Sequence, residues 1–383
     1  MMRYDLIVIG TGSAMNIVGT MINTDPGIKI AVIDKDEPGG ICLTRGCIPS
    51  KLLLYPAELV RDIETASKFG IDVDLRGIDF RTVMESMRSR ISEDINGIRA
   101  GLSGSPNIDY YHETGEFVAP YTIKVGNETI YSEMILLCTG SRPMIPPVKG
   151  LDEVGYLTSD TILELTELPE STGIIGGGYI AAEYGHFLSA MGSKVTIFGR
   201  NPRFIPEEDP EVSALAKRAM SEYMDIITGH EVVGVQYTDN GKKIIAKDLN
   251  TGRNTEVIVD EILVATGRSP NTDILHPEKA GIGTDSKGWI SVDEHLETSQ
   301  PNIWAFGDAN GKYLFKHVAN YESTVVYYNA VMGKKVSTDY HAIPHAVFSY
   351  PEIASVGLKE LQAIEKYGED NVLIGFKPDF RSI

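Results

Sequence analysis

The sequence is poor in cysteine, in tryptophan and in long apolar runs. Only 3 cysteines and 2 tryptophans occur among 383 residues. So few cysteines exclude a framework of structural disulfides. No apolar run approaches the about 20 residues that are needed to cross a bilayer. The N-terminal stretch MMRYDLIVIG has too few apolar residues for a secretory signal peptide. We therefore expect a cytoplasmic protein that does not associate with a membrane.

Basic residues are also scarce relative to acidic ones. The chain has 35 Lys and Arg against 53 Asp and Glu, which gives a formal charge of −18. This balance argues against nucleic acid or an anionic membrane as a partner, because both attract clustered cations. The apolar content of 42% and the charged content of 23% are ordinary for a globular protein. The length predicts two or three domains.

Two strand-turn-helix-strand patterns occur far apart in the chain. The first is YDLIVIGTGSAMNIVGTMI followed by IKIAVIDKD, with strands predicted at Leu6 to Ile9 and at Lys29 to Ile33. The second is STGIIGGGYIAAEYGHFLSAMG followed by SKVTIFGRN. Two such units predict two nucleotide-binding domains in an α/β chain.

The first glycine turn has the features of a dinucleotide site. Gly10 and Gly12 place backbone N–H groups at a helix N-terminus, where a pyrophosphate can bind. Asp34 ends the next strand, where a carboxylate can accept a hydrogen bond from a ribose hydroxyl. Met15 stands where a third glycine is usual, so we expect this helix to pack less closely on its strand.

The second turn begins at Gly176 and has Ala181 in the third position, which is an accepted substitution. An NAD site usually has Asp or Glu at the end of the following strand, but this chain has Gly199 there. Arg200 and Arg203 come next, and arginine suits a 2′-phosphate. The alternative is two solvated arginines on a loop. We favour NADPH over NADH.

Between and after these units the pattern changes several times. Ser50 to Glu116 is predicted to be mainly helical, and Ile226 to Ile262 alternates as a β-meander does. Phe315 to Val331 is predicted to be helical. His341 to Ile383 begins with strand-like residues and continues as a helix.

Two of the three cysteines, Cys42 and Cys47, lie in the glycine-rich stretch GGICLTRGCIPSK. Neither has a further Cys or His nearby, which argues against a metal site with three or four ligands. Cys138 is far away in the sequence and is interpreted as a small core residue. A structural staple between the close pair stays open, but so short a loop adds little stability, which favours a redox function.

A bridge between Cys42 and Cys47 has a geometric requirement. Bridged Cα atoms lie about 4.4–6.8 Å apart, whereas five residues of helix advance about 7.5 Å. A helix must therefore begin at or after Cys47, with Gly46 giving backbone freedom and Pro49 in the first turn. The helix N-terminus would stabilise a thiolate at Cys47. Lys51 follows four residues later on the same helix face.

Together these residues resemble the FAD-dependent pyridine nucleotide–disulfide oxidoreductases, a family that includes dihydrolipoamide dehydrogenase, glutathione reductase, mercuric reductase and mycothione reductase. The resemblance runs from Tyr4 to about Gly375, and its most specific motif is G-G-x-C-x4-G-C-x-P-S-K. The GTGS turn and the segments SRPMIPP and KHVAN are most similar to the mycothione reductase branch.

The resemblance implies two Rossmann-like domains and an incomplete C-terminal dimerisation domain. The FAD domain would comprise residues 1–145 and 267–340, the NAD(P) domain residues 146–266, and the dimerisation domain residues 341–383. The resemblance implies the following cofactor-binding residues: Gly10, Gly12, Ser13, Asp34, Lys35, Gly40, Lys51, Thr139, Gly140, Gly176, Gly178, Tyr179, Ile180, Arg200, Gly267, Gly307, Asp308 and Ala319.

The resemblance also implies a reaction. Lys51 would lie at the flavin N5 edge, paired with Glu183, and Tyr179 would cover the flavin until nicotinamide displaces it. Electrons would pass from NAD(P)H through FAD to a Cys42–Cys47 disulfide. Cys47 would then be the thiolate against the flavin, and Cys42 would attack a small-molecule or lipoyl disulfide.

One family feature has no match in the sequence. Family members end in a His-Pro…Glu element that serves the partner subunit of a homodimer as acid–base. His341 and His345 come too early for it, and we expect no acid to orient either of them. We expect a truncated chain that forms a homodimer when it is full length. Alternatives are an NAD-linked dihydrolipoamide dehydrogenase, a mercuric reductase, a flavin-binding redox sensor without turnover, or a zinc-binding structural protein.

Overall fold

Short runs of Val, Ile and Leu form the central strands of two parallel sheets, each in its own unit. The computed structural model describes residues 1–377. The first unit comprises residues 1–49, 88–142 and 268–340, and the second comprises residues 50–87, 143–267 and the described part of 341–383. The predicted domains are divided by the cofactor that each would bind, whereas these units are divided by their internal contacts. The prediction places residues 50–87 in the FAD domain and 341–383 in a separate dimerisation domain, so the domain boundaries stay a prediction.

The first unit is built around a sheet of 5 parallel strands. Its middle strand has the sequence LIVI and is fully buried, as expected for a strand with both faces covered. The predicted strand Leu6–Ile9 is therefore confirmed. In order, the strands are β19 (Ile303–Ala305), β8 (Ile135–Leu137), β2 (Leu6–Ile9), β3 (Ile30–Ile33) and β4 (Ile108–Tyr111).

The last of these strands corrects a prediction. The stretch Ser50 to Glu116 was expected to be mainly helical, but Ile108–Tyr111 pairs with β3 as a parallel edge strand. Its sequence IDYY shows no clear alternation, because the strand is only partly buried. Helices fill most of the rest of that stretch, as predicted: α3 (Cys47–Thr65) and α4 (Phe80–Gly104).

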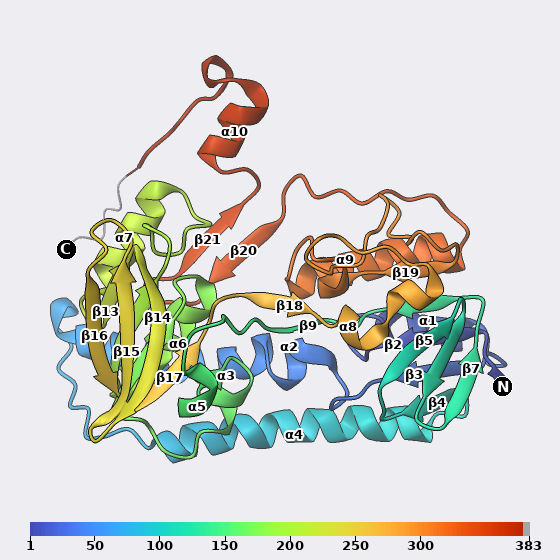
Figure 1. Cartoon of the computed structure of the whole chain (residues 1–383), viewed down its shortest axis with the longest axis horizontal. Coiled ribbons are helices and arrows are strands. Elements are labelled where there is room, and N and C mark those ends of the chain that lie inside the picture. The colour runs from blue at the N-terminus through green and yellow to red at the C-terminus, as the bar shows by residue number, and fades with distance from the viewer. Residues whose placement is uncertain (378–383) are drawn as a thin grey trace. The chain divides into compact units, whose positions relative to one another are not determined.

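Smaller elements complete the first unit, including the predicted helix after Phe315. The strands β5 and β7 pack against the parallel sheet through a shared apolar core, and Figure 1 shows them near its strands. The further helices are α1 (Met15–Thr24), α2 (Gly40–Thr44), α8 (Thr272–Leu275), α9 (Lys316–Val326) and the π-helical Tyr327–Val331. The further strands are β1 (Met2–Arg3), β5 (Gly115–Ala119), β6 (Thr122–Val125), β7 (Glu128–Tyr131), β9 (Ser141–Pro143) and β18 (Arg268–Pro270).

The second unit repeats the arrangement with another sheet of 5 parallel strands. Its middle strand, STGII, is followed by the glycine turn and by an almost wholly buried helix. In order, the strands are β10 (Leu157–Thr158), β17 (Glu261–Val264), β11 (Ser171–Ile175), β12 (Lys194–Gly199) and β13 (Asp225–Thr228). The helices are α5 (Leu151–Val154), α6 (Tyr179–Met191) and α7 (Pro210–Met220).

The predicted meander at Ile226 to Ile262 is confirmed in its middle and wrong at its ends. Three antiparallel strands form it: β14 (His230–Thr238), β15 (Gly241–Asp248) and β16 (Asn254–Val259). They are the adjacent yellow arrows in Figure 1. The flanking strands β13 and β17 instead belong to the parallel sheet, because they are short apolar runs without alternation.

The last described segment has the predicted order of strand and helix. The strands β20 (Pro344–Val347) and β21 (Ile353–Val356) pair as a hairpin, and α10 (Glu360–Tyr367) follows. The end of the predicted dimerisation domain, residues 378–383, lies outside the described residues. None of the helices formed by residues 1–377 is long and apolar enough to cross a membrane.

Candidate active site

The two glycine turns make the same close approach to a neighbouring chain segment. Gly10 follows β2 with φ +105°, and a Cβ atom there would lie 2.1 Å from the carbonyl oxygen of Cys138. Gly176 follows β11 with φ +131°, and a Cβ atom there would lie 2.1 Å from the carbonyl oxygen of Ala265. Cys138 and Ala265 each precede a Thr-Gly step, so the segments CTGSRP and ATGRSP occupy corresponding positions in the two units. Only glycine fits at either turn.

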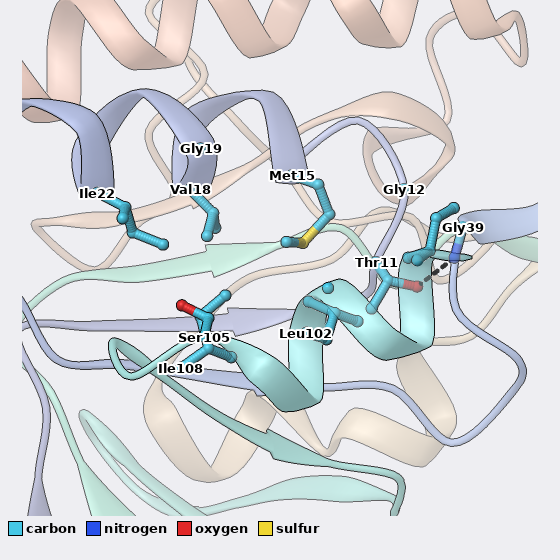
Figure 2. A pocket seen from close by; sticks show the side chains of 12 residues that line it. Thr11, Gly12, Met15, Val18, Gly19, Ile22, Gly39, Leu102, Ser105 and Ile108 are labelled. Atoms are coloured by element: carbon cyan, nitrogen blue, oxygen red, sulfur yellow. Dashed lines mark hydrogen bonds between the residues drawn. The ribbon is translucent and has the colours of Figure 1, made fainter. Parts of the chain in front are cut away.

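Hydrogen bonds fix the first turn. The backbone N–H and the hydroxyl of Thr11 donate to Asp34 Oδ2 at 2.8 and 2.6 Å. The N–H of Gly39 donates to Thr11 Oγ1 at 2.9 Å, which is the dashed line in Figure 2. Burial raises the pKa of Asp34, and the bonds from Thr11 oppose that shift. The predicted ribose ligand thus also ties its own strand to the turn.

A pocket of about 370 Å³ lies beside this turn, between α1 and α4. In Figure 2, Met15, Val18 and Ile22 of α1 point toward it, with Leu102 of α4 opposite. Met15 occupies the third position of the fingerprint, and its side chain lines the pocket rather than filling it. The pocket lies between α1 and α4 rather than between α1 and its strand, so the looser packing of helix on strand stays a prediction.

The residues beside the turn fit a bound dinucleotide. A Cβ atom on Gly40, where φ is +70°, would lie 2.7 Å from the Cα atom of Gly12, so the two backbones approach as closely as glycine allows. Within residues 1–377, Thr139 Oγ1 is buried and has no hydrogen-bond partner. Gly140 follows it with φ +65°. A hydroxyl left unsatisfied beside a glycine-lined turn is what a polar cofactor would complete.

A cation that the sequence analysis missed lies at the same helix N-terminus. Lys316 Nζ donates to Ser13 Oγ at 3.0 Å, and Ser13 donates to Asn320 Oδ1 at 2.9 Å. An ammonium group near the start of α1 adds positive charge where a pyrophosphate is expected. Lys316 belongs to the KHVAN segment, so a signal for it was present. The predicted Lys35 instead pairs with Asp36, at 3.0 Å.

The predicted Asp308 lies in a buried polar network. Ser141 Oγ donates to Asp308 Oδ2 at 2.5 Å, and Arg268 lies 3.9 Å from the same oxygen. Burial raises the pKa of Asp308, while Ser141 and Arg268 oppose the shift. A Cβ atom on the neighbouring Gly307 would lie 3.1 Å from the Cβ atom of Ala319, which brings two more predicted residues together.

The two cysteines meet where one helix ends and the next begins. Cys42 lies in α2, and Cys47 is the first residue of α3, as the disulfide geometry requires. A Cβ atom on Gly46 would lie 2.8 Å from Ile41 O and 3.2 Å from the Cα atom of Cys42. Gly46 therefore acts by permitting close approach. Among the described residues no cluster of three or more His, Cys, Asp or Glu could hold a metal ion.

The two thiols of the pair differ in their exposure. The three cysteines are thiols rather than disulfides in this structure, and Cys47 is exposed while Cys42 is half-buried. A hydrogen bond with Cys47, burial and the charge of Cys47 raise the pKa of Cys42, and Lys316 opposes the shift. Burial also raises the pKa of Cys138. The hydrogen bond and burial therefore favour the protonated form of Cys42.

In the second unit the glycine turn packs against the end of β12. A Cβ atom on Gly177 would lie 3.1 Å from the Cα atom of Gly199, the position at which an acid is usual. The N–H of Ile205 donates to Gly177 O at 2.7 Å, which holds the following loop on the turn. The Arg200 side chain is 75% exposed and lies 3.9 Å from Glu231. Gly178 and Gly267 also lie in this unit.

Lys51 and Glu183 form the predicted ion pair. Lys51 Nζ lies 3.0 and 2.9 Å from the two carboxylate oxygens of Glu183. The backbone N–H of Phe348 donates to Glu183 Oε1 at 3.0 Å, and Lys51 Nζ lies 4.4 Å from the centre of the Phe348 ring. The carboxylate is only 13% exposed. The pairing is confirmed; the catalytic role of the pair stays a prediction.

The expectation that no acid orients His345 is wrong. His345 Nε2 lies 2.5 Å from Glu208 Oε1, and the imidazole ring lies 5.9 Å from the ring of Tyr179. Glu208 precedes His345 by 137 residues. No local spacing could have indicated this pair, because it forms only when the C-terminal hairpin packs within the second unit.

The predicted residues thus divide between the two units. In the first unit are Gly10, Gly12, Ser13, Asp34, Lys35, Gly40, Cys42, Cys47, Thr139, Gly140, Gly307, Asp308 and Ala319. In the second are Lys51, Gly176, Gly178, Tyr179, Ile180, Glu183, Arg200 and Gly267. The sequence analysis missed Lys316, Phe348 and the His345–Glu208 pair.

Two glycine turns on parallel sheets and a cysteine pair define the class of dinucleotide-dependent dithiol oxidoreductases. The chain belongs to the pyridine nucleotide-disulphide oxidoreductase family, whose profile matches residues 4–331. It is 34% identical to a mercuric reductase from Staphylococcus aureus, with 95% of this chain and 66% of that protein aligned. It is 35% identical to mycothione reductase from Mycobacterium tuberculosis, with 96% and 80% aligned.

A solved structure has the same fold. The HOCl-induced flavoprotein disulfide reductase RclA from Escherichia coli superposes with a TM-score of 0.84 at 31% identity. The comparison covers 94% of this chain and 79% of that one. The predicted mixed α/β fold with dinucleotide-binding units is therefore confirmed. The chain spans just under two thirds of the mercuric reductase.

Proposed function

We propose that this chain is a flavoprotein disulfide oxidoreductase, which passes two electrons from a nicotinamide nucleotide to a disulfide substrate. The proposal depends chiefly on Cys42 and Cys47, which are hydrogen-bonded to each other where α2 meets α3. Gly40, the first residue of α2, faces Gly12 of the first glycine turn. The cysteine pair is therefore directly linked to the turn where we place FAD.

The first unit would hold FAD. The N-terminus of α1 with Ser13 and Lys316 would bind its pyrophosphate, and Asp34 would accept a hydrogen bond from its ribose. Thr139 and Asp308 would contact other polar parts of the cofactor. When bound, FAD supplies a centre that accepts a hydride equivalent and passes it on as a pair of electrons.

The cysteine chemistry balances with one hydride equivalent from the cofactor and one base that takes up a proton. Delivery of one hydride equivalent to the Cys42–Cys47 disulfide breaks the S–S bond and leaves one thiol and one thiolate. We assign the proton to Cys42, because a hydrogen bond with Cys47 and burial raise its pKa, and the negative charge to Cys47. Cys42 then loses its proton to a base and attacks one sulfur of the substrate, releasing the first thiolate. Cys47 attacks the mixed disulfide, releases the second thiolate and restores the bridge.

The second unit would hold the nicotinamide nucleotide, and we propose NADPH. Gly199 offers no carboxylate for a ribose, and Arg200 is exposed at the end of β12. Its weak pairing with Glu231 leaves it able to turn toward a 2′-phosphate. The test compares kcat/KM for NADPH and NADH in the wild-type enzyme and in Arg200→Glu. The variant should lose its preference for NADPH; an unchanged ratio would remove Arg200 from the site.

The substrate is proposed to be a small-molecule or lipoyl disulfide, and the protein is proposed to form a homodimer. The test measures NAD(P)H oxidation with lipoamide, mycothione and glutathione disulfide, together with the thiols released. Turnover should require both cysteines, so Cys42→Ser and Cys47→Ser should abolish it. If none of these disulfides is reduced by the FAD-loaded protein, the redox-sensor alternative is favoured. Light scattering of the same sample measures the oligomeric state.

A further inference from the structure

A buried carboxylate in the second unit is held by three side chains of the C-terminal hairpin and the residues after it. The Glu208 side chain is 1% exposed. His345 Nε2 lies 2.5 Å from Oε1, while Ser355 Oγ donates to Oε2 at 3.1 Å and Lys359 Nζ donates to the same oxygen. Burial alone would raise the pKa of Glu208, but the bonds from Lys359 and His345 lower it. The carboxylate therefore stays ionised.

This arrangement fixes the position of the imidazole ring. A carboxylate can only accept, so His345 must carry its proton on Nε2. Ser355 Oγ lies 3.0 Å from the same nitrogen and closes a triangle with Glu208. A short contact to a buried, charged acceptor holds the ring plane more firmly than packing alone would. Lys359 supplies the counter-charge that permits the acid to be buried.

The fixed ring lies against Tyr179. The two ring centres are 5.9 Å apart and the planes are tilted by 44°, a favourable arrangement for an aromatic pair. Tyr179 directly follows Gly178 and is the first residue of α6. Its ring therefore stands at the helix N-terminus where a dinucleotide pyrophosphate binds. Burial, Glu207 and Glu208 raise the pKa of Tyr179, so its phenol is neutral.

We propose that His345, fixed by Glu208, is a positioning residue that holds Tyr179 in its resting place at the nucleotide site. This inference rests on the proposed nicotinamide-nucleotide site at the second glycine turn. A nucleotide that displaces Tyr179 must break the contact between the two rings. The contact thus weakens nucleotide binding, and an aromatic pair corresponds to about twofold to tenfold in the dissociation constant.

Two uncharged substitutions separate the functions of the imidazole. His345→Phe keeps an aromatic ring against Tyr179 but has no N–H donor, whereas His345→Gln keeps a donor for Glu208 but has no ring. Any effect of removing the histidine charge is common to both variants. Calorimetric titration of the FAD-loaded, oxidised protein with NADP⁺ gives each dissociation constant. The control variant is His341→Gln, because His341 is an exposed histidine four residues before His345.

We expect His345→Gln to bind NADP⁺ about twofold to tenfold more tightly than His345→Phe. In steady state its KM for NADPH should fall by a similar factor while kcat stays within twofold. A merely structural role would instead weaken binding in proportion to lost stability, measured by thermal unfolding. If His345→Gln does not fold, His345→Leu takes its place, because it fills the space without an aromatic ring.

Two failures are distinguishable. If the wild-type protein binds neither NADP⁺ nor NAD⁺, the proposed function of the second unit is wrong. If the wild-type protein binds but His345→Gln, or His345→Leu in its place, binds equally or more weakly than His345→Phe, only the positioning role of His345 is refuted.

Discussion

A buried histidine in the second unit makes stability depend on pH. His186 of α6 is 2% exposed, its ring is stacked at 6.0 Å on Tyr350, and Tyr223 lies edge-on at 6.2 Å. Its Nδ1 has no hydrogen-bond partner among residues 1–377. Burial and the nearby Arg61 lower the pKa of His186 to about 4. The folded protein therefore keeps this imidazole neutral.

The sign and size of the effect follow from linkage. An unfolded histidine has a pKa of about 6.5, so the unfolded state takes up a proton first as the pH falls. The stability associated with a neutral His186 is fully present above pH of about 6.5 and is lost as the pH falls toward about 4. Between pH of about 7.5 and about 5 the loss amounts to about 2 kcal/mol.

The assay is urea unfolding of the FAD-loaded protein at both pH values, followed by far-UV circular dichroism. Since carboxylates titrate in the same range, His186→Phe is the matched variant, because it keeps the aromatic contacts and cannot titrate. Its loss of unfolding free energy between the two pH values should be about 2 kcal/mol smaller than that of the wild type. Hydrogen exchange of α6 gives a local readout. Equal losses in both proteins would refute the reasoning.

Two further predictions concern the cysteine loop and the ion pair. In Gly46→Ala the new methyl group meets the backbone at Ile41 O. We therefore expect the free energy of unfolding to fall by about 1–3 kcal/mol and the disulfide bridge to form more slowly, as measured by thiol titration. The control Gly97→Ala, whose methyl group has no neighbour within contact distance, should have neither effect. Glu183→Gln leaves the charge of Lys51 without its partner, so a flavin beside Lys51 should have a higher midpoint potential in this variant and a lower one in Lys51→Met. Equal flavin potentials in spectroelectrochemical titrations of the two variants would contradict the position of Lys51 beside the flavin.

Much of the fold could be predicted because its signals are local. Fully buried parallel strands appear as short apolar runs, and the glycine turns that begin at Gly10 and Gly176 each predict the helix that follows. The same periodicity failed at β4, whose sequence IDYY is partly exposed. It also failed at β13 and β17, which flank the meander in sequence but pair in the parallel sheet.

The site residues also divide into those that local sequence spacing indicates and those that only distant contacts bring together. The spacing of Cys42, Cys47 and Lys51 is local, so it could be read directly from one motif. The pairing of Lys51 with Glu183 required the family resemblance, because 132 residues separate them. Nothing comparable indicated Glu208 for His345, since neither residue belongs to a motif and their contact depends on how the hairpin packs in its unit.

The central claim is that Cys42 and Cys47 form the redox-active pair, with Cys47 as the thiolate. Anaerobic addition of NADPH to the oxidised, FAD-loaded protein tests it most directly by absorption spectroscopy. A long-wavelength band should appear in the wild type and should be absent in Cys47→Ser. In Cys42→Ser, which can form no bridge, the band should be present before NADPH is added and should be lost when the flavin is reduced. A flavin that is reduced without the band in the wild type, or a band that persists in Cys47→Ser, would contradict the claim.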